Sequence, residues 1–294
     1  MLLKAAIFAL HYMQWSFMNL TPTYEQMCAL TGSWDGERDA GGRPRVPDAV
    51  LQALRSATVE HVWQVMKDHG YPPQFAGGFL QTRPGAVLVG RCVTAQFLPH
   101  RPDLDAAVRA AGGALGLVAD APQNAWVVDM LVDGDVMVAD IFGKVREGTV
   151  IGDNLGSAIA RQTRAGAIID GGVRDLPGLT SLPEPFVVFY RGTDPTPIED
   201  VVLGSFNAPV RIGEATVLPG DVALGTPAGV AFIPAHLAAE VARTALEIES
   251  RDTFSKQRLR EGRYTTAAID VATWPEEIEA DYRAWLDHHG PGTT

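Results

Sequence analysis

The sequence is poor in cysteine, in clustered basic residues and in long apolar runs, and each shortage excludes a class of protein. Its 294 residues contain two cysteines, Cys28 and Cys92, which do not form a disulfide framework or a metal-binding spacing and are expected to be reduced thiols. No run of 18 apolar residues predicts a membrane-spanning helix. The formal net charge is −11 without a run of Lys and Arg, which argues against nucleic acid and anionic membranes as partners. A soluble, cytoplasmic protein is expected.

Several common catalytic motifs are also missing. The sequence shows no Walker phosphate loop and no Ser-His-Asp order, and residues 112–116 lack the order of a dinucleotide fingerprint. His100 lies in a proline-rich loop, where a solvated histidine is the more common case. His61 and His69 stand on one helical stretch, and a helix-surface role is expected for them rather than metal binding.

The composition and the positions of turn-forming residues suggest three segments. Hydrophobic residues make up 46% and charged residues 20%, which is typical of a globular chain with a real core. Residues 1–46 are interpreted as an N-terminal extension: they open like a signal peptide, but the apolar run is short and no small-x-small cleavage site follows. Residues 47–250 are expected to form the catalytic domain. Residues 251–294 are expected to form a C-terminal helix and an aromatic tail that packs onto the body or onto a neighbouring subunit.

The middle of the chain alternates strand and helix patterns. Apolar spacing predicts helices that begin at Pro47, at Asn154 and at Ala235, with stops at Gly70 and Gly166 for the first two. Short buried strands are predicted at residues 135–140, 167–170 and 186–190, and a β-rich section is predicted after about residue 200. This alternation predicts an α/β fold whose sheet contains parallel strands.

One segment brings chemistry-bearing residues to one end of that sheet. Asp153 stands at the start of a predicted helix, and about 12 helical residues rise about 18 Å. A following strand of five or six residues returns about 17–20 Å. Asp153, Arg174 and Asp175 are therefore expected to meet beyond the carboxyl ends of the strands, where open α/β sheets bind ligands.

These residue types suit an α-keto acid. The helix-start amides of Asn154 and Leu155 can hold a carboxylate. Arg174 can hydrogen-bond the carbonyl oxygen and stabilise an enolate. Asp175 offers a hard oxygen ligand for Mg²⁺ or Mn²⁺, and Asp153 can hold a metal-bound water, because Mg²⁺ keeps several waters in protein sites.

Each of these residues also has a purely structural interpretation. Asp153 can be an ordinary helix N-cap, since aspartate is among the preferred capping residues. Arg174 and Asp175 can form a structural turn, with Asp175 as its Asx residue. The residues alone leave both interpretations open.

Residues 152–175, GDNLGSAIARQTRAGAIIDGGVRD, resemble the signature of the RraA-like family, with its G-[DE]-x-L helix start and D-G-x-x-R-D. That family includes class II 4-hydroxy-4-methyl-2-oxoglutarate and 4-carboxy-4-hydroxy-2-oxoadipate aldolases and the ribonuclease E regulator RraA. The resemblance covers roughly residues 50–250. It implies a swivelling β/β/α-type fold in a trimeric ring, sometimes doubled to a hexamer. It also implies metal at Asp175, pyruvate at Arg174 and a metal-bound water at Asp153.

The chain departs from the family pattern in places that concern the substrate. Residues 226–229 replace an acidic cluster that many members carry. The first helix of the family usually has an aspartate near the position of Glu60. In the aldolases a neighbouring subunit adds an acidic residue from its C-terminal helix; Glu247 and Glu249 are both candidates. The longer ends can reshape the pocket.

The function expected is a metal-dependent carbon–carbon lyase. It would cleave a 4-hydroxy-2-oxo acid by a retro-aldol reaction to give pyruvate, with oxaloacetate decarboxylation as a second reaction through the same enolate. Two alternatives stay open: a non-catalytic regulator that binds a ribonuclease, and a lyase or hydrolase acting on another enolisable acid. A methyltransferase role is discounted, because nothing in the sequence resembles a methyl-donor site.

Overall fold

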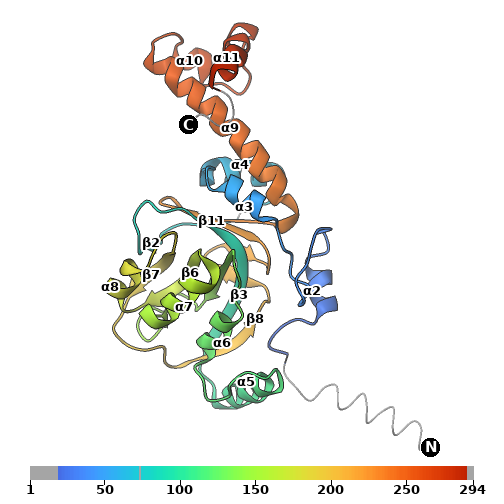
Figure 1. Ribbon diagram of the computed structural model, residues 1–294, viewed down its shortest axis with the longest axis vertical. Helices are drawn as coiled ribbons and strands as arrows, with labels where there is room; N and C mark the ends of the chain where they lie inside the picture. The colour runs from blue at the N-terminus through green and yellow to red at the C-terminus, as the bar shows by residue number, and fades with distance from the viewer. Residues whose placement is uncertain (1–18, 73, 290–294) are drawn as a thin grey trace, which may run out of the picture.

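A computed structural model describes residues 19–72 and 74–289. The body is a sheet flanked by helices, and one long helix leads from it to a small helical group at the C-terminal end (Figure 1). Residues 1–18, the first part of the predicted N-terminal extension, lie outside the described residues.

A mixed sheet of ten strands forms the body, and its central strands are parallel. Its main path runs β1-β12-β11-β3-β4-β6-β7-β2, with β5 on β6 and β8 on β3, while β9 and β10 form a separate hairpin. The strands are β1 Phe75–Ala76, β2 Leu80–Gln81, β3 Leu88–Pro99, β4 Asp135–Asp140, β5 Thr149–Ile151, β6 Gly166–Val173, β7 Val187–Thr193, β8 Val201–Phe206, β9 Val210–Ile212, β10 Ala215–Val217, β11 Val222–Thr226 and β12 Gly229–Ile233.

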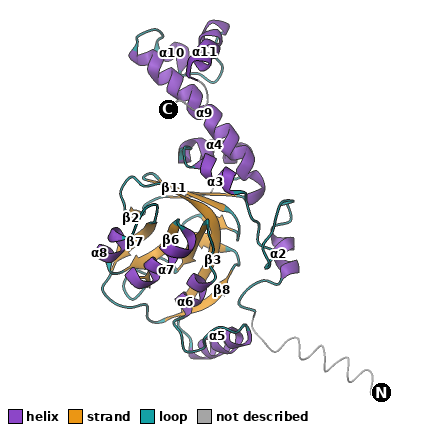
Figure 2. Ribbon diagram, viewed as in Figure 1, coloured by secondary structure: helices purple, strands orange, loops and turns teal. Residues whose placement is uncertain are grey.

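The helices lie on the sheet and beyond it (Figure 2). They are α2 Tyr24–Leu30, α3 Asp48–Leu54, α4 Val59–Asp68, α5 Pro102–Ala114, α6 Gln123–Asp129, α7 Asp153–Thr163, α8 Leu176–Ser181, the 3-10 turn η1 Ala235–Leu237, α9 Ala238–Arg260, α10 Thr266–Ile269 and α11 Glu276–His289. The predicted α/β class is confirmed, and so is the C-terminal helical region.

Two cores on opposite faces of the sheet explain why its strands form. Every residue of β4 and β6 is buried, as expected for parallel strands covered on both faces. Ala139 and Ile169 point to a core shared with α5, α6, α7 and α8. Their neighbours Val138 and Ile168 point to a core closed by the β9–β10 hairpin. The chain therefore stacks hairpin, sheet and helices, with α7 between the sheet and solvent.

Two helix predictions were wrong in detail. The helix predicted from Pro47 to Gly70 is two helices, α3 and α4, because Thr58 adopts an extended conformation and its hydroxyl caps the amide of His61. The predicted stop at Gly166 is not a cap. Arg164 takes the left-handed conformation that ends α7, and Gly166 begins β6, where a Cβ would lie 1.9 Å from the carbonyl oxygen of Val187.

Helix α9 is longer than the predicted 235–249 and carries a small core of its own. Phe254 on its distal half is fully buried among Ile269, Trp274, Ile278 and Trp285. The aromatic tail therefore packs on α9 rather than on the body, because α9 continues far enough past the sheet to offer its own apolar surface.

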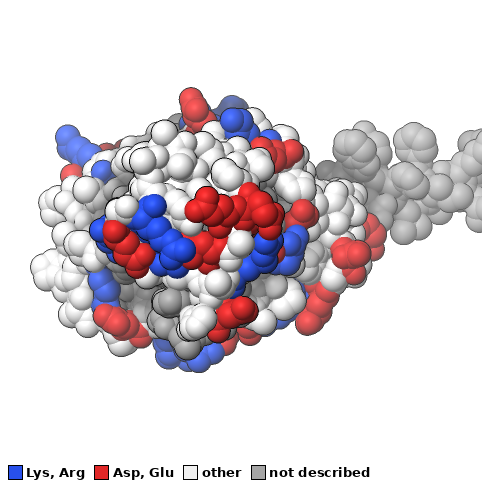
Figure 3. All heavy atoms as spheres, turned by 90° about the horizontal axis from the view of Figure 1, so that it is seen from above, with Lys and Arg blue, Asp and Glu red and all other residues white. Residues whose placement is uncertain are grey.

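Ion pairs brace this C-terminal group. Arg251 pairs with Glu279 and Arg258 with Asp281, both at 2.7 Å. Seen from this end of the molecule, acidic and basic side chains lie side by side rather than in separate fields (Figure 3).

Candidate active site

Four elements meet where the predicted site residues lie. Gly152 joins β5 to α7, and Arg174 and Asp175 join β6 to α8. The amide of Arg174 donates to the carbonyl oxygen of Ile151 at 3.1 Å, which ties the two connections together. A Cβ on Gly152 would lie 2.3 Å from Asp175 Oδ2 and 3.1 Å from Arg174 Nε. The backbone at Gly152 therefore runs directly against both side chains, and only glycine leaves room for them.

Asp175 does not act as an Asx-type cap. It precedes α8 with φ of 54°, in the left-handed region, and its side chain makes no capping hydrogen bond. This conformation is costly for most residues and is tolerated best by Gly, Asn and Asp. Asp175 Oδ2 lies 3.4 Å from Arg174 Nε, and both side chains are about 40% exposed, at 44% and 40%. The backbone thus holds a solvent-accessible carboxylate beside a guanidinium.

Asp153 is not the N-cap of α7 either. The cap position belongs to Gly152, and Asp153 is the first helical residue. A Cβ on Gly178 would lie 2.5 Å from the Cβ of Asp153, so the start of α8 packs closely against this side chain. Neither aspartate therefore makes the capping hydrogen bond that its structural interpretation would give it.

The five predicted residues share one cavity of about 270 Å³. The first turn of α7 lies at its wall, and an α-helix leaves its first amides without helical acceptors. Those amides and the positive end of the helix dipole favour an anion, as does Arg174. The cavity is lined by Pro122, Asn124, Ala125, Thr149, Val150, Gly152, Asp153, Asn154, Leu155, Arg174, Asp175, Pro197 and Ile198.

Sequence reasoning missed Asn124, which reaches the cavity from α6. Its side chain is buried, and its Nδ2 donates to the carbonyl oxygen of Val150 at 2.6 Å. Its Oδ1 is buried and has no hydrogen-bond partner among the described residues. A buried acceptor without a partner is costly, so a donor on a ligand or a water would complete it. An asparagine in a short helix carries no sequence signal of this, because the neighbours that surround it are distant in the chain.

A divalent cation fits the donor set at this place. Asp175 supplies a hard carboxylate oxygen at the cavity, and Asp153 adds a second carboxylate to its lining. Few protein ligands in an accessible site suit Mg²⁺ or Mn²⁺, which keep water or substrate oxygens in their remaining positions. The positive charge of the adjacent Arg174 favours a ligand that itself carries negative charge.

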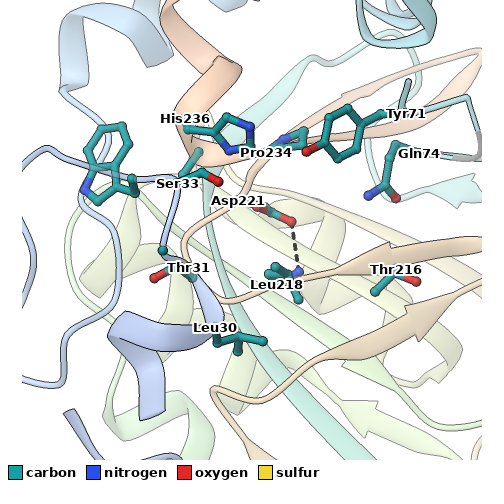
Figure 4. Close-up of a pocket in the computed structure, with 13 residues that line it drawn as sticks. Leu30, Thr31, Ser33, Tyr71, Gln74, Thr216, Leu218, Asp221, Pro234 and His236 are labelled. Carbon is teal, nitrogen blue, oxygen red and sulfur yellow. Dashed lines mark hydrogen bonds between the residues drawn. The ribbon is translucent and has the colours of Figure 1, made fainter. Parts of the chain in front are cut away.

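A second cavity, of about 350 Å³, contains none of the predicted residues (Figure 4). It lies between the loop after α2 and the β11–β12 region, and Tyr71, Asp221 and His236 face it. Burial raises the pKa of Asp221 to about 7, even though its carboxylate accepts from the amide of Leu218. Burial and the nearby His69 lower the pKa of His236. The Asp221 carboxyl is therefore mainly uncharged in mildly acidic solution, and the lowered pKa of His236 favours its neutral form.

Comparison with known proteins places the chain among RraA-like proteins. The RraA-like family, described as Aldolase/RraA, matches residues 46–232. A putative 4-hydroxy-4-methyl-2-oxoglutarate aldolase of Halalkalibacterium halodurans is 32% identical over 101 residues, which cover 34% of this chain and 47% of that protein. Protein DlpA of Legionella pneumophila is 28% identical over 217 residues, 71% of this chain and 31% of that protein. The matches thus span half or less of these relatives.

Solved structures agree on the fold. RraAS2 of Streptomyces coelicolor, an unusual member of the RNase ES inhibitor RraA protein family, superposes with a TM-score of 0.62 at 24% identity, covering 73% of this chain and 100% of that one. An uncharacterized protein of Pseudomonas syringae gives 0.61 at 22% identity, covering 74% and 91%. Among the described residues, no helix has the length and apolar character needed to cross a bilayer.

Proposed function

The chain belongs to the RraA-like family, and we propose that it is a divalent-metal-dependent lyase that releases pyruvate from a 4-hydroxy-2-oxo acid. The observation that supports this most is the convergence of Asp153, Arg174 and Asp175 with the first amides of α7 on one cavity. An enolate-forming reaction needs an anion site, a cation beside the carbonyl oxygen and a carboxylate for the metal, and these residues provide all three.

The substrate's C1 carboxylate would lie at the amides of Asn154 and Leu155, at the positive end of α7. Its C2 carbonyl oxygen would then face the guanidinium of Arg174. Asp175 would hold Mg²⁺ or Mn²⁺, which supplies positive charge that polarises a carbonyl oxygen.

The bond that breaks joins C3 to C4. The C4 hydroxyl loses its proton, with the Asp153 carboxylate as the base at this end of the cavity, and C4 becomes a carbonyl. The electron pair of the broken bond moves into the C2–C3 enolate, whose oxygen is stabilised by Arg174. The proton taken by Asp153 then passes to C3, which gives pyruvate and restores the carboxylate. Oxaloacetate would lose CO₂ to form the same enolate, so one site would serve both reactions.

A non-catalytic regulator is the second candidate, since RraAS2 is a member of the RNase ES inhibitor RraA protein family. The close fit of Gly152 against Asp175 and Arg174 disfavours it. A protein-binding surface does not need a left-handed aspartate inside a cavity.

The test is pyruvate release from 4-hydroxy-4-methyl-2-oxoglutarate and from oxaloacetate, followed with lactate dehydrogenase and NADH. Activity is expected with Mg²⁺ or Mn²⁺ and not with EDTA. Arg174→Ala and Asp175→Ala are expected to reduce kcat/KM by at least about 100-fold. Asp120→Ala, which changes an exposed aspartate outside the cavity, should leave it unchanged.

Three results would count against the proposed lyase activity. If both substrates stay intact with either metal, the retro-aldol assignment is wrong. If Arg174→Ala and Asp175→Ala retain full activity, the reaction takes place elsewhere. Capture of a ribonuclease by an Asp175→Ala variant that is otherwise inactive would favour the regulator.

A further inference from the structure

Helices α4 and α9 lie against each other in opposite directions, and two histidines of α4 face carboxylates of α9. His61 Nδ1 lies 3.4 Å from Glu249 Oε2, and His69 Nε2 lies 3.3 Å from Glu240 Oε1. The sequence predicted a helix-surface role for both histidines. The structure places them at a helix–helix contact instead.

The two pairs differ in the number of possible metal-ligating groups beside them. At the first pair, Asp252 adds a third ligating group, and the ligand atoms of His61, Glu249 and Asp252 all lie within 4.8 Å of one another. Glu249 and Asp252 are three residues apart on α9, so both project from the same face. Among the described residues, no third His, Cys, Asp or Glu joins His69 and Glu240 in this way.

The facing atoms of His61 and Glu249 are left without hydrogen bonds. His61 Nδ1 and Glu249 Oε2 are both buried, and neither has a hydrogen-bond partner among the described residues. The other carboxylate oxygen, Glu249 Oε1, accepts from the hydroxyl of Thr253 at 3.4 Å, which orients the side chain. Two buried polar atoms without hydrogen bonds are costly, and here either a proton on His61 or a third species bound by both atoms would satisfy them.

Their separation suits a metal ion. Zinc binds imidazole nitrogen at about 2.0–2.1 Å and carboxylate oxygen at about 2.0–2.2 Å in tetrahedral geometry, so neighbouring ligand atoms stand about 3.4 Å apart. The observed distance between His61 Nδ1 and Glu249 Oε2 is 3.4 Å. Asp252 contacts Lys256 through Oδ2, and a carboxylate has a second oxygen for a metal.

We propose that His61, Glu249 and Asp252 form a zinc-type transition-metal site that joins α9 to α4. One imidazole and two carboxylates, with a fourth position left for water, suit zinc and similar ions better than Mg²⁺, which prefers all-oxygen sites. The site is separate from the candidate active site, and it does not depend on the proposed lyase activity.

Its position gives the metal a structural consequence. Ala238, Val241, Ala242 and Ala245 bury the first half of α9 against the body, and Phe254 buries the second half in the C-terminal core. Residues 249–252 lie between these two contacts. A metal there would fix the direction in which α9 leaves the body, and with it the placement of α10 and α11.

The experiment uses the full chain, stripped of metal with a chelator and carrying Asp175→Ala, in excess Mg²⁺, so that zinc binding at the candidate active site is suppressed. Zinc is titrated against a chromophoric competitor, and hydrogen exchange of residues 246–256 is measured with and without zinc. One equivalent is expected to bind and to slow this exchange. His61→Gln and Glu249→Gln should each weaken zinc binding by at least about 10-fold, because loss of a ligand costs no less than loss of an outer partner.

The matched controls are His69→Gln and Glu240→Gln, which break the neighbouring two-residue contact and should leave zinc affinity unchanged. If His61→Gln does not fold, Glu249→Gln decides, since it keeps the shape of the side chain. Absence of bound zinc would overturn the proposal. Zinc binding that survives both His61→Gln and Glu249→Gln, or that falls equally in the controls, would overturn it as well.

Discussion

Gly152→Ala tests the candidate site without changing any residue that would carry the chemistry. The added Cβ would lie 2.3 Å from Asp175 Oδ2 and 3.1 Å from both Cγ and Nε of Arg174. Gly152 itself has φ of −119° and ψ of −166°, an extended conformation that any residue adopts. The backbone at position 152 is therefore not strained by alanine, and the steric conflict falls on the two side chains.

The magnitude follows from the distances. Carbon and oxygen atoms in ordinary contact stand about 3.5 Å apart, so Asp175 has to move by about 1 Å. Misplacement of a reacting or positioning group by about 1 Å costs on the order of 100-fold in rate. Because Arg174 and Asp175 are both partly exposed, they can turn toward solvent, and the cost in folding stability should stay within about 1–3 kcal/mol.

The assay is kcat/KM for pyruvate release together with the thermal midpoint of unfolding. Gly113→Ala is the matched control, because a Cβ there meets nothing within 4 Å and the residue lies inside α5. The control should keep its activity and gain up to about 0.5–1 kcal/mol of stability. A Gly152→Ala protein with nearly full activity would refute the reasoning, since it would mean that the positions of Asp175 and Arg174 do not matter.

Three further changes test the interior. Burial raises the folded-state pKa of Asp221 from 3.8 to about 7, so the folded protein binds more protons than the unfolded chain between these pH values. The free energy of unfolding therefore falls as pH rises through that window, by up to about 4 kcal/mol. Asp221→Asn should flatten the curve of thermal midpoint against pH there, and an unchanged slope would contradict the raised pKa. Asp135→Asn should instead cost about 3–5 kcal/mol in urea unfolding. The buried Arg43, which contacts both carboxylate oxygens of Asp135 at 3.0 Å, would keep only the partly exposed Asp39 as a counter-charge; a loss below about 1 kcal/mol would argue against this. Phe254→Ala should destabilise the C-terminal helices by about 3–5 kcal/mol and should speed hydrogen exchange in α11 while β4 stays protected. Equal effects in α11 and β4 would show that the C-terminal core and the sheet unfold together.

Local sequence pattern predicted the elements that carry the site. The strand at residues 135–140 and the helix that starts beside Asp153 appear in the structure as β4 and α7. A short apolar run between two aspartates can be buried as a strand, and an apolar stripe at helical spacing can be buried as a helix. The lengths of α7 and β6 were enough to predict that the chain returns to the start of the helix. The prediction that Gly166 ends the helix depended on a single glycine and was wrong, since a glycine allows close packing of strands as readily as it ends a helix.

Local sequence was enough to predict the α/β alternation, the helix start at Asp153 and the nearness of Arg174 and Asp175 to it, because these depend on residues close together in the chain and on fixed rises per residue. Three contacts could be seen only in the folded chain: Asn124 enters the same cavity from α6, the aromatic tail packs on α9, and His61 faces Glu249 and Asp252. Those contacts join residues that are far apart in the chain, and their distances are set by the packing of whole helices rather than by any local pattern.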